Sequence, residues 1–110
     1  MAADVFSFDV EHPSATHSVV RLAGEIDMLT APDFRDCLDE NLAAHTQHLV
    51  LNFSGVTFLG SSGLAVLLDL KGAAERQGTK LYLVDAASSV ARVLDVTGLA
   101  AMFSDEPPPP

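Results

Sequence analysis

The stretch TFLGSSGLAVLL, residues 57–68, holds the change from strand to helix around which the rest of the chain is organised. Before it, HLVLNF at residues 48–53 is a continuous apolar run, typical of a strand covered on both faces. Within residues 57–68, two glycines bracket two serines, and an apolar run follows. We expect the helix formed by this run to end near Gln77, before Gly78. We predict a buried strand, a sharp turn and a helix with Ser61 or Ser62 as its N-cap.

The segments before this stretch favour a hairpin and a helix. Residues 5–10 alternate apolar and polar side chains, which indicates a half-buried strand. Residues 17–24 read as a second strand stopped by Gly24, joined to the first by the turn-rich EHPSAT at residues 11–16. Thr30 is the expected N-cap of a first helix, in which Phe34, Leu38 and Leu42 recur every four residues as one buried stripe.

The segments after it predict a further strand and helix. KLYLVD at residues 80–85 reads as a buried strand, Ser88 or Ser89 as the cap of a third helix ending at Gly98, and AMF at residues 101–103 as a short last strand. The order ββαβαβα(β) predicts an α/β (α+β-like) fold: a small mixed sheet with helices packed mainly on one face. We expect a single domain over residues 1–104 and a disordered acidic, proline-rich tail over residues 105–110.

Composition restricts the partners of this chain. Its 110 residues carry a formal charge of −9, which repels nucleic acids and anionic membrane surfaces, so a protein partner is the better expectation. No stretch approaches the roughly 18–20 apolar residues of a membrane span. The N-terminus has no basic segment or apolar signal core, and one cysteine fits a reducing compartment. We therefore expect a cytoplasmic protein.

The sequence contains no motif typical of catalysis, metal binding or cofactor binding. The glycine-serine turn is neither G-x-S-x-G nor a phosphate-binding P-loop, and no nucleophile–base pair can be assembled. The buried helix stripe next to Cys37 favours a structural thiol. We expect no enzyme activity, no metal and no cofactor, because metal-ligand spacing is not found among the four histidines: His12, His17, His45 and His48.

The two serines allow a structural and a regulatory interpretation. As helix caps they need no further role. However, the first two turns of the helix are apolar almost all round, which indicates burial by neighbouring helices or a docked partner. A serine at this helix start would lie at the C-terminal end of a buried strand. A phosphate there would add about −1.5 to −2 charges and oppose docking.

Four stretches resemble the STAS-domain anti-sigma factor antagonists, also called anti-anti-sigma factors. RLAGEIDMLTAP is similar to the family's G-E-[LI]-D-x-x-[TN]-A, and VLNFSGVTFLGSSGLAVLL to its D-L-S-x-V-x-F-[IM]-D-S-S-G-L-G-x-L-L. LVDAASSVARVLDVTGL is similar to its N-x-x-x-x-V-x-R-x-L-x-x-[ST]-G-L, and the closing phenylalanine matches as well. The match spans about residues 5–104. Where the family has aspartate before the two serines, this chain has Gly60.

The resemblance implies a small mixed sheet with packed helices and a regulatory function. An unphosphorylated antagonist binds an anti-sigma factor, a serine kinase of the GHKL ATPase type, and frees the sigma factor to activate transcription. Phosphorylation of the first serine breaks the complex, and a PPM/PP2C-type phosphatase restores it. By position that serine is Ser61, with Ser62 as the second choice, and Asp27 matches the acidic residue beside the site.

The alternative is a non-switching adaptor subunit of a larger assembly, such as a stressosome or a lipid-transport ATPase complex. A nucleotide- or anion-binding domain is a third interpretation, with little basic character near the turn to support it. The expected partner-binding residues come from two loops and a helix start: Glu25, Ile26, Asp27, Met28, Thr30, Leu59, Gly60, Ser61, Ser62, Gly63, Leu64, Val66 and Asp69.

Overall fold

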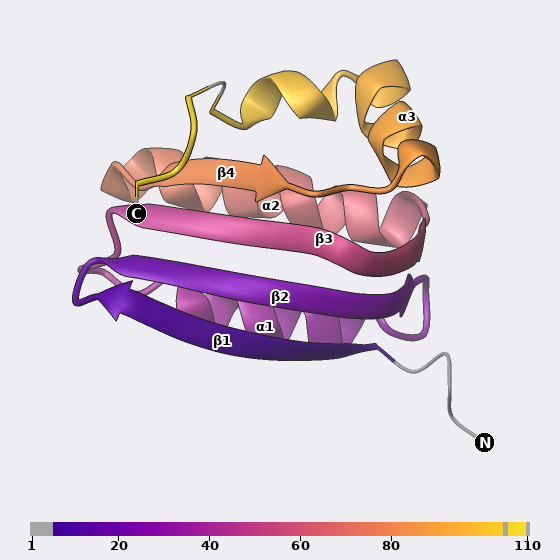
Figure 1. Ribbon diagram of the computed structural model, residues 1–110. Coiled ribbons are helices and arrows are strands. Elements are labelled where there is room, and N and C mark those ends of the chain that lie inside the picture. Colours follow the sequence, from indigo (N-terminus) through magenta and orange to yellow (C-terminus); the bar gives the residue numbers. More distant parts are fainter. Residues whose placement is uncertain (1–5, 105, 110) are drawn as a thin grey trace.

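The computed structural model describes residues 6–104 and 106–109, which fold into one four-stranded sheet with helices (Figure 1). The sheet order is β1-β2-β3-β4; β1 and β2 are antiparallel, whereas β3 is parallel to both of its neighbours. The predicted edge hairpin and mixed sheet are confirmed. In chain order the elements are β1 (Ser7–Ser14), β2 (His17–Ile26), α1 (Ala31–Asn41), β3 (His48–Leu59), α2 (Ser61–Gln77), β4 (Lys80–Val84), α3 (Ser88–Thr97) and the 3-10 helix η1 (Leu99–Met102).

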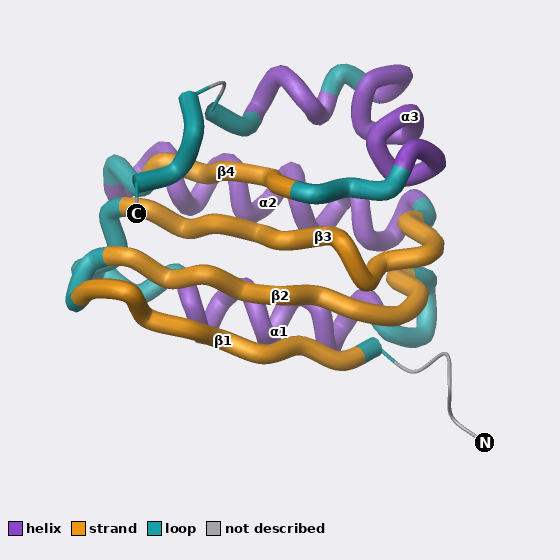
Figure 2. Tube along the Cα trace, in the orientation of Figure 1, coloured by secondary structure: helices purple, strands orange, loops and turns teal. Residues whose placement is uncertain are grey.

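Helices α1 and α2 cover the same face of the sheet, which confirms the predicted arrangement. Each connects two neighbouring parallel strands and must therefore cross back over the sheet. Figure 2 shows both behind the sheet, while α3 and η1 lie beyond its β4 edge. Helix α2 ends at Gln77, followed by Gly78 at a φ of 78°, as predicted from the glycine.

Strands β1, β2 and β3 extend further than the sequence pattern predicts. Strand β1 continues through the expected connection to Ser14, with a register shift between Glu11 and Ser14. Strand β2 does not stop at Gly24. That glycine has a φ of 103° and lies at a register shift against β3, so it forms an irregularity within a strand that continues to Ile26. Val5, the expected start of the first strand, lies outside the described residues.

Two predictions about the C-terminal part are wrong. Residues 101–103 do not form a strand, because the chain turns at Gly98, with a φ of 79°, directly into η1. Helix α3 is not capped by a serine side chain; Ala87 occupies the N-cap position and Ser88 is the first helical residue. The proposed disorder of residues 105–110 stays a prediction, with Asp105 and Pro110 outside the described residues.

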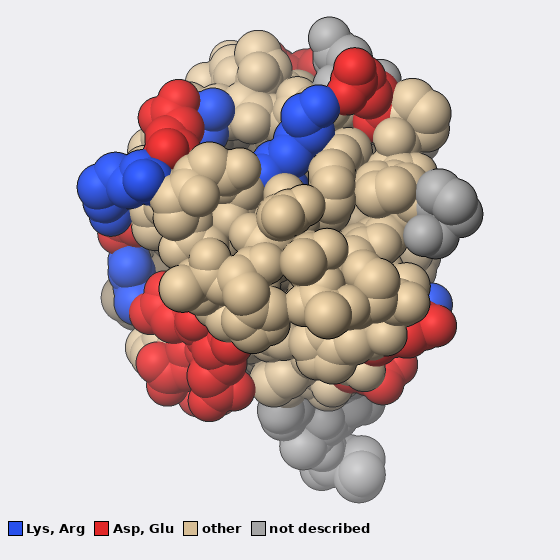
Figure 3. All heavy atoms as spheres, turned by 90° about the vertical axis from the view of Figure 1, so that its left-hand side faces the viewer, with Lys and Arg blue, Asp and Glu red and all other residues tan. Residues whose placement is uncertain are grey.

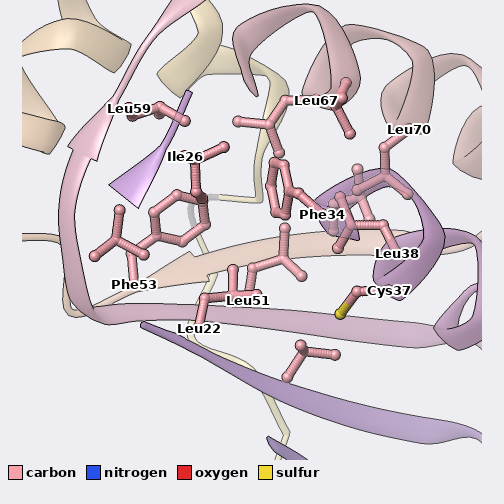
Figure 4. Packing of buried hydrophobic residues seen from close by; sticks show 14 of the residues in the cluster. Leu22, Ile26, Phe34, Cys37, Leu38, Leu51, Phe53, Leu59, Leu67 and Leu70 are labelled. Atoms are coloured by element: carbon pink, nitrogen blue, oxygen red, sulfur yellow. The ribbon is translucent and has the colours of Figure 1, made fainter. Parts of the chain in front are cut away.

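The core lies between the sheet and helices α1 and α2 (Figure 4). Phe34 of α1 makes edge-to-face contacts with Phe6 and with Phe53 of β3, at ring-centroid distances of 5.7 and 6.5 Å. Cys37 is 1% exposed, which confirms the predicted structural thiol. Burial, and secondly the nearby Glu40 carboxylate, raise the pKa of this thiol to about 12.

Burial against α1 explains why α2 is apolar on more than one side. Leu67 and Leu70 point towards Phe34 and Leu38 of α1 in Figure 4, and Val66 is 4% exposed. A helix that contacts both a sheet and a second helix needs a wider apolar face than one packed on a sheet alone. Burial by the neighbouring helix therefore accounts for Val66 and Leu70, whereas Leu68 remains exposed.

Candidate functional site

The site lies at the edge of the sheet where β2 and β3 end and α1 and α2 begin. Strand β3 ends at Leu59, and α2 begins at Ser61. Gly60 between them has extended backbone, and its N–H donates to the carbonyl of Ile26 over 2.9 Å. This bond joins the β3–α2 junction to the end of β2. It places the serine turn at the carboxyl ends of two parallel strands, as we predicted from the sequence.

The serines do not cap the helix as expected. Gly60 is the N-cap, and Ser61 and Ser62 are the first two helical residues, with no side-chain hydrogen bond capping α2. The Gly60 carbonyl instead accepts the N–H groups of Gly63 and Leu64, each over 3.1 Å. Ser61 is exposed and Ser62 is half-buried. The Ser61 hydroxyl therefore faces solvent at the positive end of a 17-residue helix, a place that tolerates added negative charge.

Asp27 and Thr30 hold the loop between β2 and α1 in shape. The Asp27 carboxylate accepts the N–H groups of Leu29 and Thr30 over 2.9 and 3.1 Å. The Thr30 hydroxyl donates to the Glu25 carbonyl over 2.8 Å and accepts the Asp27 N–H over 2.9 Å. Thr30 has the predicted N-cap position of α1, but its side chain makes no cap bond to that helix. Both side chains therefore act on the loop.

The loop presents apolar side chains to solvent. Met28 is 76% exposed and Leu29 is 83% exposed. On the neighbouring strand end Phe58, which pairs with Glu25 in register, is 51% exposed. We call Met28, Leu29, Phe58, Gly60 and Ser61 the junction surface. Large exposed apolar side chains at one edge of a domain are typical of an interaction site.

Phe58 also lies over the glycine at which this chain departs from the family pattern. A Cβ atom placed on Gly60 would be 3.0 Å from Phe58 Cε2 and 3.3 Å from Phe58 Cζ. The backbone of Gly60, with φ −94° and ψ −178°, is open to any residue. An aspartate at this position therefore needs only a displacement of the Phe58 ring by a few tenths of an ångström.

The structure separates the predicted partner-binding residues into two groups. Ile26, Leu59, Gly63 and Val66 are buried, so they position the surface and do not form it. We expected Val66, like Asp69, on the exposed part of the second helix, but Val66 is only 4% exposed. Asp69 is exposed, and its carboxylate pairs with Arg35 of α1 over 2.8 Å. The remaining predicted residues are exposed or half-buried: Glu25, Asp27, Met28, Thr30, Gly60, Ser61, Ser62 and Leu64.

Sequence reasoning missed Leu29 and Phe58. Leu29 and Met28 form an apolar pair in the loop between the end of a strand and a helix cap. Apolar side chains are unusual in such a loop, so the pair was a signal that the sequence analysis could have used. Phe58 gives none, because strand β3 loses its alternation there: Val56 and Leu59 are buried, while Thr57 and Phe58 are exposed.

Charge pairing leaves little free positive charge for an anionic ligand. Four of the six basic side chains are in ion pairs: Arg21 with Glu11, Arg35 with Asp69, Lys71 with Glu75 and Lys80 with Glu106. On the end of the molecule opposite the junction surface, basic and acidic side chains also lie next to one another (Figure 3). Among residues 6–104 and 106–109 there is no group of three or more potential ligands placed to hold a metal ion. No described helix is long and apolar enough to cross a membrane.

Comparisons with known proteins find similar sequences and similar folds. A family model described as the STAS domain matches residues 7–108. The anti-sigma F factor antagonist of Paenibacillus polymyxa is 34% identical over 82 residues, which are 74% of this chain and 70% of that protein. The crystal structure of an anti-sigma factor antagonist from Mycobacterium paratuberculosis has a TM-score of 0.76 and 32% identity, over 93% of this chain and 86% of that one.

A more distant structure has the same fold. The anti-sigma factor antagonist SpoIIAA in its unphosphorylated form has a TM-score of 0.76 at 22% identity, over 92% of this chain and 89% of that one. At this identity the likeness concerns the fold alone. It confirms the mixed sheet and the placement of the helices.

Proposed function

This chain belongs to the STAS-domain family of anti-sigma factor antagonists, and from that premise we propose that it binds an anti-sigma factor and thereby releases a sigma factor to activate transcription. The observation that carries the proposal is the junction surface, where an exposed serine at a helix start lies at the same edge of the sheet as three exposed apolar side chains. The proposal places the chain in the cytoplasm, where sigma factors act.

The junction surface has the character of a docking site. Full burial of a large apolar side chain contributes about 1.5–3 kcal/mol. In the free chain most of the Met28 and Leu29 side chains and about half of the Phe58 side chain are exposed. Their burial against a partner can therefore contribute free energy to association. The hydrogen bonds of Asp27 and Thr30 hold the Met28–Leu29 loop before binding, which lowers the entropy lost on docking.

We propose Ser61 as the phosphate acceptor that controls docking, with the bound anti-sigma factor, a GHKL-type serine kinase, as the kinase and a PPM/PP2C-type phosphatase as its opponent. The positive N-terminal end of α2 favours a phosphate by about 0.3–1 kcal/mol. The same charge of about −1.5 to −2 prevents the neighbouring apolar side chains from being buried against a partner. A loss of 1.4 kcal/mol weakens association about tenfold.

Binding to a candidate anti-sigma factor kinase tests the proposal. Ser61→Asp should weaken binding about tenfold or more, and Ser61→Ala should retain it and resist release by ATP. Ser88→Asp is the matched control, because Ser88 is also the exposed first residue of a helix whose preceding residue gives no side-chain cap. Equal loss of binding in both acidic variants would show a general charge effect and contradict the assignment of Ser61.

Mass spectrometry after incubation with the kinase and ATP separates antagonism from switching. Phosphate on Ser61 supports the switch, while stable binding with an unmodified Ser61 removes the switch and keeps the antagonist. Co-purification with transporter or stressosome subunits, and with no anti-sigma factor, would favour the adaptor alternative. The variant Gly60→Asp tests the departure from the family: faster phosphorylation than wild type would show that the missing carboxylate limits kinase recognition.

A further inference from the structure

The sheet face turned away from α1 and α2, here called the open face, contains side chains that are buried without a helix over them. Val50 of β3 pairs in register with Val19 of β2 and with Tyr82 of β4. Because side chains alternate along a strand, Val50 points away from its core neighbours Leu49 and Leu51. Val50 and Tyr82 are nevertheless each 3% exposed, so part of the chain other than α1 and α2 must cover them.

Residues 106–109, the C-terminal segment, lie over this part of the open face. In Figure 1 the segment descends in front of the start of β4, on the side opposite α1 and α2. The Ser104 N–H donates to the Leu81 carbonyl over 2.7 Å and directs the chain along the edge of β4. Glu106 then pairs with Nζ of Lys80 over 2.6 Å, and the prolines at 108 and 109 are half-buried. The ion pair raises the pKa of Lys80 and lowers that of Glu106.

The surface beneath the segment is aromatic. His48 and Tyr82 are 5.7 Å apart between ring centroids, and the Tyr82 hydroxyl lies 2.8 Å from His48 Nδ1. His17 is 6.0 Å from His48 in an edge-to-face arrangement and is 5% exposed. Rings of this kind form the grooves that recognise proline-rich segments, whose extended conformation exists before binding and therefore costs little entropy.

We infer that His17, His48, Lys80 and Tyr82 form a binding site for an acidic segment followed by prolines, occupied here by this chain's own C-terminal residues. Lys80 recognises the carboxylate, and the aromatic rings contact the prolines. The site lies where β3 and β4 begin, whereas Ser61 follows the end of β3, on the order of 30 Å away along the strand. It is a second interaction surface, and it does not depend on the proposed function of the first.

Tyr82 provides a specific measurement, because the chain has one tyrosine and no tryptophan. We propose to measure acrylamide quenching of Tyr82 fluorescence in the full chain, with circular dichroism to verify the fold. Glu106→Lys places two positive charges together and should raise the quenching constant about two-fold or more, as Tyr82 becomes open to solvent. The double variant Lys80→Glu with Glu106→Lys should return it to the wild-type value. Glu75→Lys breaks a comparable exposed ion pair with Lys71 and should leave it unchanged.

The synthetic peptide DEPPPP, which has the sequence of residues 105–110, then tests the site itself. Added to Glu106→Lys, it should lower the quenching constant again in a saturable manner, whereas wild type should show no further decrease because its own segment already covers Tyr82. Glu106→Gln repeats the test if the lysine variant does not fold. Equal quenching in wild type and in the folded variants would show that the segment does not cover Tyr82 and would overturn the inference. Increased quenching with no saturable response to the peptide would also overturn it.

Discussion

An alanine at position 63 of α2 would bring its Cβ atom within 2.6 Å of Ile26 Cγ2 and 2.7 Å of Leu59 Cδ1. Both contacts are shorter than van der Waals contact allows. Ile26 is completely buried and branched at Cβ, so its methyl group has no free space into which to rotate. Gly63 therefore lets the first turn of α2 approach the ends of β2 and β3, and Gly63→Ala should separate them.

The same helix provides a control of opposite sign. At Gly72 a Cβ atom would meet only Arg76 Nη1, at 3.4 Å, the end of a flexible side chain. Gly72→Ala should therefore gain the helix propensity of alanine, about 0.5–1 kcal/mol. At position 63 that gain is outweighed by overpacking, which costs typically about 1–3 kcal/mol. We expect Gly63→Ala to lose about 1–2 kcal/mol and the two variants to differ by about 1.5–3 kcal/mol in free energy of unfolding.

Urea and thermal unfolding, followed by circular dichroism at 222 nm, measure this difference. At roughly 3–6 °C per kcal/mol for a domain of this size, the melting temperatures of the two variants should differ by at least about 5 °C. An unchanged urea m-value would show that the difference in free energy of unfolding does not come from a change in the unfolded state. If Gly63→Ala proves as stable as Gly72→Ala, the close approach at the start of α2 is not rigid, and the explanation of this glycine by packing is refuted.

Three further changes test other parts of the structure. Cys37 should resist thiol reagents at pH 8 in the folded chain and react only on unfolding, because burial raises its pKa to about 12; rapid labelling under native conditions would contradict this. The pKa of His17 is lowered by burial and secondly by His48, so its contribution to stability is present above pH 6.5 and is lost as the pH falls through the lowered value. Wild type should therefore lose more stability than His17→Gln between pH 7 and 5. Parallel stability profiles of the two chains over this pH range would contradict the assignment to His17. The other nearby groups, Lys80, Tyr82 and Glu106, are common to both chains and do not cause the difference. Asp27→Ala should lower the free energy of unfolding by about 1–2 kcal/mol, because the loop hydrogen bonds of the carboxylate are lost. Asp27→Asn should lower it much less, because the amide oxygen still accepts these bonds. Equal losses in the two variants would show that the charge of Asp27, not its hydrogen bonds, stabilises the loop.

The candidate site was predictable where local chemistry defines it. The glycine-bracketed serines follow an apolar strand, which is sufficient to place Ser61 at a helix start and at the carboxyl edge of the sheet. The sequence did not indicate which neighbours reach the surface. Ile26 and Met28 are both apolar and only two positions apart, yet one is completely buried and the other is 76% exposed. The hydrogen bonds of Asp27 turn the chain between them, and this turn depends on the position of Thr30.

The sequence by itself determined the order of the elements from β1 to α3, the hairpin, the burial of Cys37 and the helix ends at Gly78 and Gly98, because periodicity and glycine conformation act over a few residues. Tertiary structure decided the features that depend on distant contacts. Strand β2 continues past Gly24 because β3 pairs with it up to Ile26, which local propensity does not include. The C-terminal segment lies on the open face because Lys80 holds Glu106, 26 positions later in the chain. A proline-rich end has no periodicity from which such a contact can be predicted, so only the folded sheet shows where it binds.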